Sequence, residues 1–220
     1  METRLHGNPD YGHLEVRLEA GEAVLAESGA MAWMDSGLEL RARMAGGFLR
    51  ALGRRFLGGE SFFLAEYRAP AASTIHLAPS LPGSLREAVL GAEGIWVAPG
   101  AFLAAEPEIE LRTRFLGWRG LFSGTGPFFL RLQGPGRRVV LASYGALVEE
   151  AVDGERIVDT GHLVAWEPGL DFRVTTPGGW KPTLFSGEGL LLRFRGRGRL
   201  WLQTRNLPAT AAWLGPLLPA

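Results

Sequence analysis

The sequence contains no cysteine among its 220 residues. Disulfide bonds, thiolate nucleophiles and thiolate metal ligands are therefore excluded. No stretch approaches the roughly 18 uncharged apolar residues that a membrane-spanning helix needs, and residues 1–11 lack the apolar core of a signal peptide. These absences predict a soluble, cytoplasmic protein without a transmembrane segment.

Net charge is also absent, because 23 basic residues balance 23 acidic ones. No overall field draws the chain to nucleic acid or to anionic lipid, so only a local basic patch could do so. Lys181 is the single lysine, and asparagine and glutamine are both rare. We interpret this bias as typical of a GC-rich genome, a thermophile, or both.

Glycine and proline are abundant, with 31 and 14 residues. Together with 46% hydrophobic residues, they give the composition of a globular protein with many turns and few long helices. The composition favours an all-β fold.

Three copies of one unit follow each other along the chain. In each copy a glycine (positions 29, 100 and 161) precedes a mostly apolar run, and an acidic residue lies six positions after it: Asp35, Glu106 and Glu167. A turn pair and an alternating segment follow each acid, at Leu38–Arg41, Ile109–Arg112 and Leu170–Arg173. This alternation has the period of a half-buried strand.

The repeats predict one all-β domain over residues 12–206, with units at about 12–80, 84–145 and 146–206. Their β-hairpins are expected to form a pseudo-threefold sandwich or barrel-like body. We expect the aliphatic positions of the alternating segments, Leu38 and Leu40 among them, to be buried. The arginines at the ends of those segments are expected to be exposed and to form ion pairs with the repeated acids: Arg41, Arg112 and Arg173.

Two apolar segments lie outside the repeat. Residues 45–57 show helical spacing of apolar residues around Phe48, and the tail over residues 207–220 is rich in proline, alanine and leucine. Apolar segments that a repeated core does not need are expected to dock on another surface. We therefore predict a homo-oligomer with contacts through Phe48 and through three tail residues: Trp213, Leu214 and Leu217.

Several motifs resemble one known family. They are Gly29-Ala30-Met31, Gly59-Glu60-Ser61, Ser143-Tyr144-Gly145-Ala146, Asp159 to Trp166, Gly187-Glu188-Gly189 and Trp201 to Arg205. Together they resemble the altered inheritance of mitochondria protein 24 family over about residues 14–206. The resemblance implies an all-β fold like that of the tryptophan RNA-binding attenuation protein, a mitochondrial inner-membrane organising role in eukaryotes, and unknown function in prokaryotes. It implies no catalytic residues.

Motifs of catalytic type have structural explanations. Asp159-Thr160-Gly161 and Asp35-Ser36-Gly37 resemble aspartic-protease loops, but the two aspartates occupy non-equivalent positions of the repeat, so they are interpreted as turn residues. The four histidines, of which His162 stands in the most apolar run, show no metal-ligand spacing. We therefore predict no catalytic residues, no metal and no cofactor.

Arginines gather in two places. Arg193, Arg195, Arg197 and Arg199 alternate along one predicted hairpin and so share one face, called here the arginine face. A second group accompanies the predicted helix: Arg50, Arg54 and Arg55. The arginine face is either an anion-binding stripe or a solvated surface paired with Glu149, Glu150 and Asp171.

The sequence therefore favours a non-enzymatic scaffold or interaction protein that self-associates. One alternative is a module that binds RNA or anionic lipid weakly through the arginines. A second alternative is a hydrolase built around Asp159 and His162.

Overall fold

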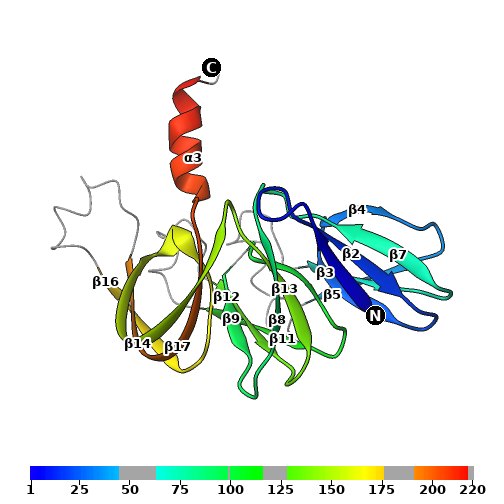
Figure 1. Ribbon diagram of the computed structural model, residues 1–220, viewed down its shortest axis with the longest axis horizontal. Helices are drawn as coiled ribbons and strands as arrows, with labels where there is room; N and C mark the ends of the chain where they lie inside the picture. Colours follow the sequence, from blue (N-terminus) through cyan, green and yellow to red (C-terminus); the bar gives the residue numbers. More distant parts are fainter. Residues whose placement is uncertain (45–62, 99, 116–127, 176–190, 218–220) are drawn as a thin grey trace.

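The computed structural model describes residues 1–44, 63–98, 100–115, 128–175 and 191–217. In these residues the helices and strands are almost entirely β-strands, with one α-helix, α3 (Leu207–Leu214), near the C-terminus (Figure 1). The expected all-β class is confirmed. The helix predicted over residues 45–57 lies outside the described residues, together with Phe48, Arg50, Arg54 and Arg55.

The first repeat contributes six strands and follows an extra N-terminal strand, β1 (Glu2–His6). The six are β2 (His13–Leu18), β3 (Ala23–Glu27), β4 (Met31–Met34), β5 (Glu39–Met44), β6 (Phe63–Arg68) and β7 (Ser73–Leu77). The second repeat has the same succession: β8 (Leu85–Val89), β9 (Ile95–Val97), β10 (Phe102–Ala105), β11 (Glu110–Phe115), β12 (Phe128–Gln133) and β13 (Arg138–Ala142).

In the third repeat, two pairs of strands are fused. Its elements are β14 (Leu147–Asp159), the 3₁₀ turn η2 (Thr160–His162), β15 (Leu163–Trp166), β16 (Leu170–Thr175) and β17 (Leu191–Gln203). β14 takes the place of the first and second strands, and β17 takes the place of the fifth and sixth. The tail then forms α3 and a 3₁₀ turn, η3 (Gly215–Leu217).

Strand pairing is the same in all three repeats. The sixth strand pairs with the first and the third, and the fifth strand pairs with the second and the fourth. All of these pairs are antiparallel. The alignment of glycines and acids in the sequence therefore corresponds to a real repetition of strand pairs.

The sheets are shared between neighbouring repeats. One sheet has the order β5-β6-β3-β10-β13-β8, so three strands come from the first repeat and three from the second. The next sheet, β11-β12-β9-β15-β17-β14, joins the second repeat to the third, and a four-stranded sheet, β1-β2-β7-β4, lies at the other end of the molecule (Figure 1). Adjacent repeats are thus held together by ladders of backbone hydrogen bonds.

The repeated acids fix the turns, though in another way than expected. Asp35, Glu106 and Glu167 each accept a hydrogen bond from a backbone N–H of their repeat's sixth strand, at Thr74, Arg138 and Arg199. The predicted ion pairs with Arg41 and Arg112 are wrong, because these arginines pair with Glu39 and Glu110 on their own strands. Side chains two residues apart share one face of a strand, which brings each such pair into reach.

Two buried clusters form the core, one under the first repeat and its junction with the second, the other under the second and third repeats. Trp166 lies in the larger cluster and meets Phe129 and Phe172 edge-on. The burial expected for Leu38 is confirmed, but Leu40 is 59% exposed. β5 is the edge strand of its sheet, and no described element covers Leu40.

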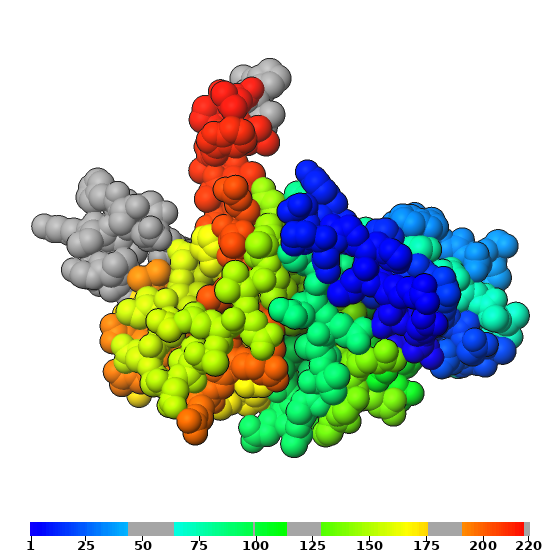
Figure 2. Space-filling model, viewed as in Figure 1, coloured from blue at the N-terminus to red at the C-terminus, as the bar shows by residue number. Residues whose placement is uncertain are grey.

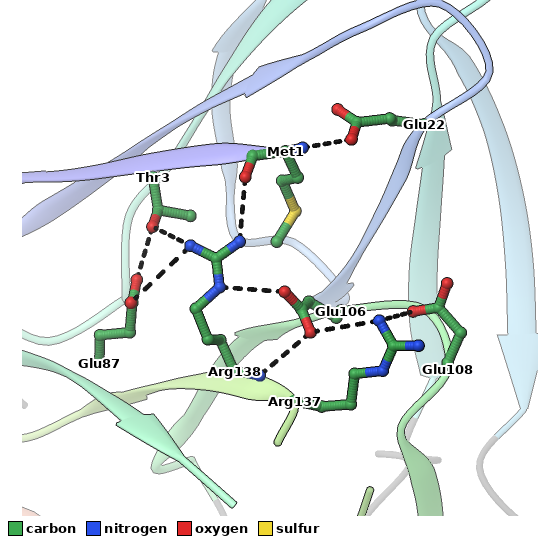
Figure 3. A network of polar contacts seen from close by, with 8 residues as sticks. All are labelled: Met1, Thr3, Glu22, Glu87, Glu106, Glu108, Arg137 and Arg138. Atoms are coloured by element: carbon green, nitrogen blue, oxygen red, sulfur yellow. Dashed lines mark hydrogen bonds and ion pairs between the residues drawn. The ribbon is translucent and has the colours of Figure 1, made fainter. Parts of the chain in front are cut away.

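A polar network anchors the N-terminal strand (Figure 3). The guanidinium of Arg138 donates to Glu106 at 3.0 Å and to the carbonyl oxygen of Met1 at 2.9 Å, and it lies 3.4 Å from Thr3 Oγ1. The Met1 ammonium pairs with Glu22. This network joins β1 to the first and second repeats at once, although nothing in the repeat pattern predicted a strand there.

Candidate functional site

The tail helix α3 is exposed along its whole length. None of its residues is buried, and Trp213 is 71% exposed. Figure 2 shows the helix projecting away from the body of strands. The predicted anchors Trp213, Leu214 and Leu217 thus form an apolar surface that the described part of the chain leaves open.

Hydrogen bonds to the third repeat fix the base of α3. Asn206 caps the helix, since its Oδ1 accepts from the N–H of Ala209 at 2.7 Å, and its Nδ2 donates to His162 Nε2 at 2.9 Å. His162 Nδ1 donates to the carbonyl oxygen of Gln203 at 2.7 Å. The body therefore sets the direction in which the helix points.

A hollow of about 330 Å³ lies beside this base. Its lining includes Glu27, Gly100, Ser143, Tyr144, Gln203 and Leu207, so all three repeats and the tail contribute. The Tyr144 hydroxyl lies 3.0 Å from the Thr210 hydroxyl of α3 and links the wall of the hollow to the helix. Hydroxyl, amide and carboxylate groups of this kind can hydrogen-bond a polar segment of a polypeptide.

Asp159 and His162, the residues of the hydrolase alternative, both hold local structure. Asp159 caps η2, where its Oδ1 accepts from the N–H of Gly161 at 2.7 Å. Both ring nitrogens of His162 have partners, at Gln203 of β17 and at the helix cap Asn206. Within the described residues, no group of three or more histidine and carboxylate side chains is placed to hold a metal ion.

The arginine face is a row of ion pairs. Glu155 contacts both Arg193 and Arg195, at 2.8 and 2.6 Å, and Asp153 contacts Arg197 at 2.9 Å. Arg199 pairs with Glu167 and with the predicted partner Glu149, whereas Glu150 pairs with Arg156. The hydrogen bond from Arg195, with the charge of Arg193, holds the pKa of the Glu155 carboxyl below its usual value. These carboxylates neutralise the arginines.

Strand β4 carries an exposed aromatic group that sequence reasoning missed. Trp33 is 53% exposed and stacks on His76 of β7, with 4.3 Å between ring centroids. His76 lies 5.6 Å from His13, which stacks on His6 at 4.9 Å. A signal was present in the sequence, because Trp33 occupies the repeat position at which the other units have Ala104 and Ala165.

Burial and neighbouring histidines affect the pKa of His13, which lies in a cluster with His6, His76 and Trp33. Partial burial, followed by the charges of His6 and His76, lowers the pKa of His13. The hydrogen bond with His6 Nε2, at 2.7 Å, lowers the pKa of Glu15, and Arg17 acts in the same direction.

Among the described segments, α3 included, there is no helix of the length and apolarity needed to span a membrane. The family model for mitochondrial biogenesis AIM24 matches residues 3–205. The chain belongs to the AIM24 family. This confirms the resemblance drawn from the motifs.

Two relatives of this AIM24 chain come from Streptococcus pyogenes. An uncharacterized protein of Streptococcus pyogenes serotype M6 is 29% identical over 216 residues, which cover 94% of this chain and 86% of that protein. The crystal structure of a Streptococcus pyogenes protein has a TM-score of 0.82 and 26% identity, and the match covers 99% of each chain. Neither name states a reaction or ligand. The likeness to the tryptophan RNA-binding attenuation protein, the cytoplasmic location and the thermophilic source stay predictions.

Proposed function

We propose that this AIM24 protein is a non-enzymatic interaction protein that self-associates through its tail helix. The observation that carries the proposal is that α3 is apolar and that none of its residues is buried. An eight-residue helix is too short to be stable in water by itself, so its stability must come from its cap and from packing. The cap is present at Asn206, and packing along the rest of the helix requires a partner.

A protein surface suits α3 better than a lipid surface. Helices that lie on membranes combine an apolar face with a lysine- or arginine-rich polar face. From Asn206 to Leu217 the tail has no charged side chain, and the net charge of the chain is zero. A second copy is the favoured partner, because most soluble oligomers are built from identical chains.

The anion-binding alternative is supported less well. Exposed ion pairs contribute only about 0–1 kcal/mol, so an RNA or lipid phosphate could displace a carboxylate at small cost. However, the acids stay beside the arginines and repel an incoming anion. Retention on heparin that falls steeply with salt would favour this alternative, and weak retention at low salt would count against it.

Truncation after Asn206 tests the proposal. The truncated chain should have a smaller mass by light scattering than the full chain, with an unchanged β-type circular dichroism spectrum, because the strands do not need α3.

A matched pair of point variants is Trp213→Ser, at the expected contact, and Ala211→Ser, on the same exposed helix. Removal of a large aromatic anchor typically weakens an interface by about 1–4 kcal/mol. The oligomer of Trp213→Ser should therefore dissociate at a higher protein concentration than the oligomers of the unaltered chain and of Ala211→Ser. A monomeric full chain would overturn the proposal.

A further inference from the structure

Neighbouring repeats join by one rule. The second strand of a repeat pairs with the third strand of the repeat that follows it: β3 with β10, and β9 with β15. The register is the same at both junctions, since Ala104 faces Ala26 and Ala105 faces Leu25, just as Ala165 faces Val97 and Trp166 faces Trp96. Counted from the repeat glycines, these are equivalent positions.

The same rule leaves two strand edges without partners among the described residues. The third strand of the first repeat, β4, pairs with β7 alone, and the second-strand part of β14, residues 155–158, pairs with β17 alone. Burial reflects the missing partners. All four residues of β10 and of β15 are buried, whereas in β4 three are exposed and Met34 is half-buried. In β14, Ile157 is 47% exposed, while its equivalent Leu25 is buried.

The two open edges cannot satisfy each other within one chain. Figure 1 shows β4 and the β14–β16 region at opposite ends of the longest axis of the molecule. A projection can only shorten a distance, so the real separation is at least as large as the one seen.

We infer that β4 of one copy pairs with the open edge of β14 of a second copy, in the register of the internal junctions. Trp33 then faces Val158, and Met34 faces Ile157. The contact completes a sheet of order β16-β17-β14-β4-β7-β2, which matches β5-β6-β3-β10-β13-β8 strand for strand. The inference rests on the proposed self-association but uses sheet edges in place of the tail helix.

The chemistry of β4 suits such a contact. Proteins normally protect an open strand edge with charges, proline or a bulge that turns the edge away. β4 consists of Met31, Ala32, Trp33 and Met34, with no charge and no proline. Its register shift between Met31 and Trp33 recurs in β10 and β15, which both pair with a further strand, so this irregularity does not close the edge. Added strands gain affinity from main-chain hydrogen bonds, and a tryptophan is a frequent anchor in protein interfaces. The two edges differ, so the contact is head-to-tail and produces a ring or a filament.

Disulfide trapping tests the register. Because the chain contains no cysteine, Met34→Cys and Ile157→Cys each introduce a single thiol. Opposed residues of antiparallel strands have Cα atoms about 4.5–5.5 Å apart, which a disulfide can bridge. Mixing the two full-length variants under mild oxidation should give a cross-linked heterodimer. Val148→Cys is the matched control, because Val148 is as exposed as Ile157 and lies on the same strand, outside the predicted contact.

Cross-linking of Met34→Cys should be severalfold greater with Ile157→Cys than with Val148→Cys. Equal yields, or none, would overturn the inference. A double variant, Met34→Cys with Ile157→Cys, should give a ladder of linked chains, and a monomer with an internal disulfide would also overturn it. Adding Trp213→Ser separates the two proposals, because edge cross-linking should persist when the tail contact is lost.

Discussion

His13 stands between two other histidines on adjacent strands, and this placement makes one sheet sensitive to acid. Its ring stacks on His6 and lies near His76 and Trp33, while Glu15 on the same strand binds His6 and Arg17. Partial burial lowers the pKa of His13, and the charges of His6 and His76 lower it further, because like charges at about 5 Å repel.

Stability should therefore fall as pH decreases from about 7.5 to 5.5. Below about pH 6.5 the unfolded chain binds a proton at His13 more readily than the folded chain does, so acid favours unfolding. The lowered pKa of Glu15 adds a separate loss at more acidic pH, because its contribution is present above the ordinary glutamate pKa and is lost as pH falls through the folded-state pKa. Urea unfolding at the two pH values measures the difference. The variant His13→Asn should make the profile flatter, and an unchanged profile would contradict the assignment.

Gly83 occupies a position where a side chain cannot fit. It forms an isolated parallel bridge with Gly145, and a Cβ atom added to it would lie 2.0 Å from the carbonyl oxygen of Ser143. Gly83→Ala should therefore lower the free energy of unfolding by about 1–3 kcal/mol. Gly91→Ala is the control, because no heavy atom lies within 4 Å of the new Cβ there. Urea denaturation of both variants checks the contrast, and equal effects would refute it.

At the scale of elements, α3 depends on one cap that also binds the body. Asn206→Ala removes the acceptor for Ala209 and the donor to His162, and loss of a cap of this kind costs about 0.5–2 kcal/mol. Asn206→Asp keeps the acceptor and loses the donor. We expect amide hydrogen exchange over residues 207–217 to be fastest in Asn206→Ala and intermediate in Asn206→Asp. Equal exchange in all three chains would show that the cap does not hold the helix.

Most strands were predictable because their signals are local. The repeated glycines have positive φ at Gly29 and Gly100, where a side chain would be strained, and the apolar runs after them became β4, β10 and β15. Alternation identified the face that carries Arg41 and Arg112, which are exposed as expected. The three-copy alignment also placed the tail outside the repeated body.

What sequence reasoning missed depends on distant neighbours. Alternation gives the face of Leu40 but does not show that β5 is an edge strand with no described cover. The partners of Asp35, Glu106 and Glu167 lie more than thirty residues away along the chain and could not be read from nearby arginines. The anion-binding and oligomer roles assigned to site residues stay predictions.

At the scale of the whole molecule, Arg138 joins three parts of the chain through one side chain. It contacts the N-terminal strand at Met1 and Thr3, Glu87 of β8, and Glu106 beyond β10 (Figure 3). Arg138→Gln should lower the free energy of unfolding by about 1–3 kcal/mol, because partly buried acceptors lose a charged donor. Arg137→Gln is the neighbouring control, because Arg137 is half-exposed and its ion pairs are longer, at 3.7 Å to Glu106 and 3.4 Å to Glu108. Ion pairs of a solvent-exposed arginine are worth about 0–1 kcal/mol. Urea titration of both should separate them, and equal losses would contradict the linking role.

Two sheets are each shared between two neighbouring repeats, which makes the repeat a unit of sequence but not a unit of folding. A single repeat cut from the chain would carry half of one sheet and half of another, each with an open edge. At both junctions, the second strand of one repeat pairs with the third strand of the repeat that follows it. Tandem duplication of such a gene segment can therefore add a repeat through a contact of the kind already present. After deletion of the middle repeat, the second strand of the first repeat would still match the third strand of the last repeat.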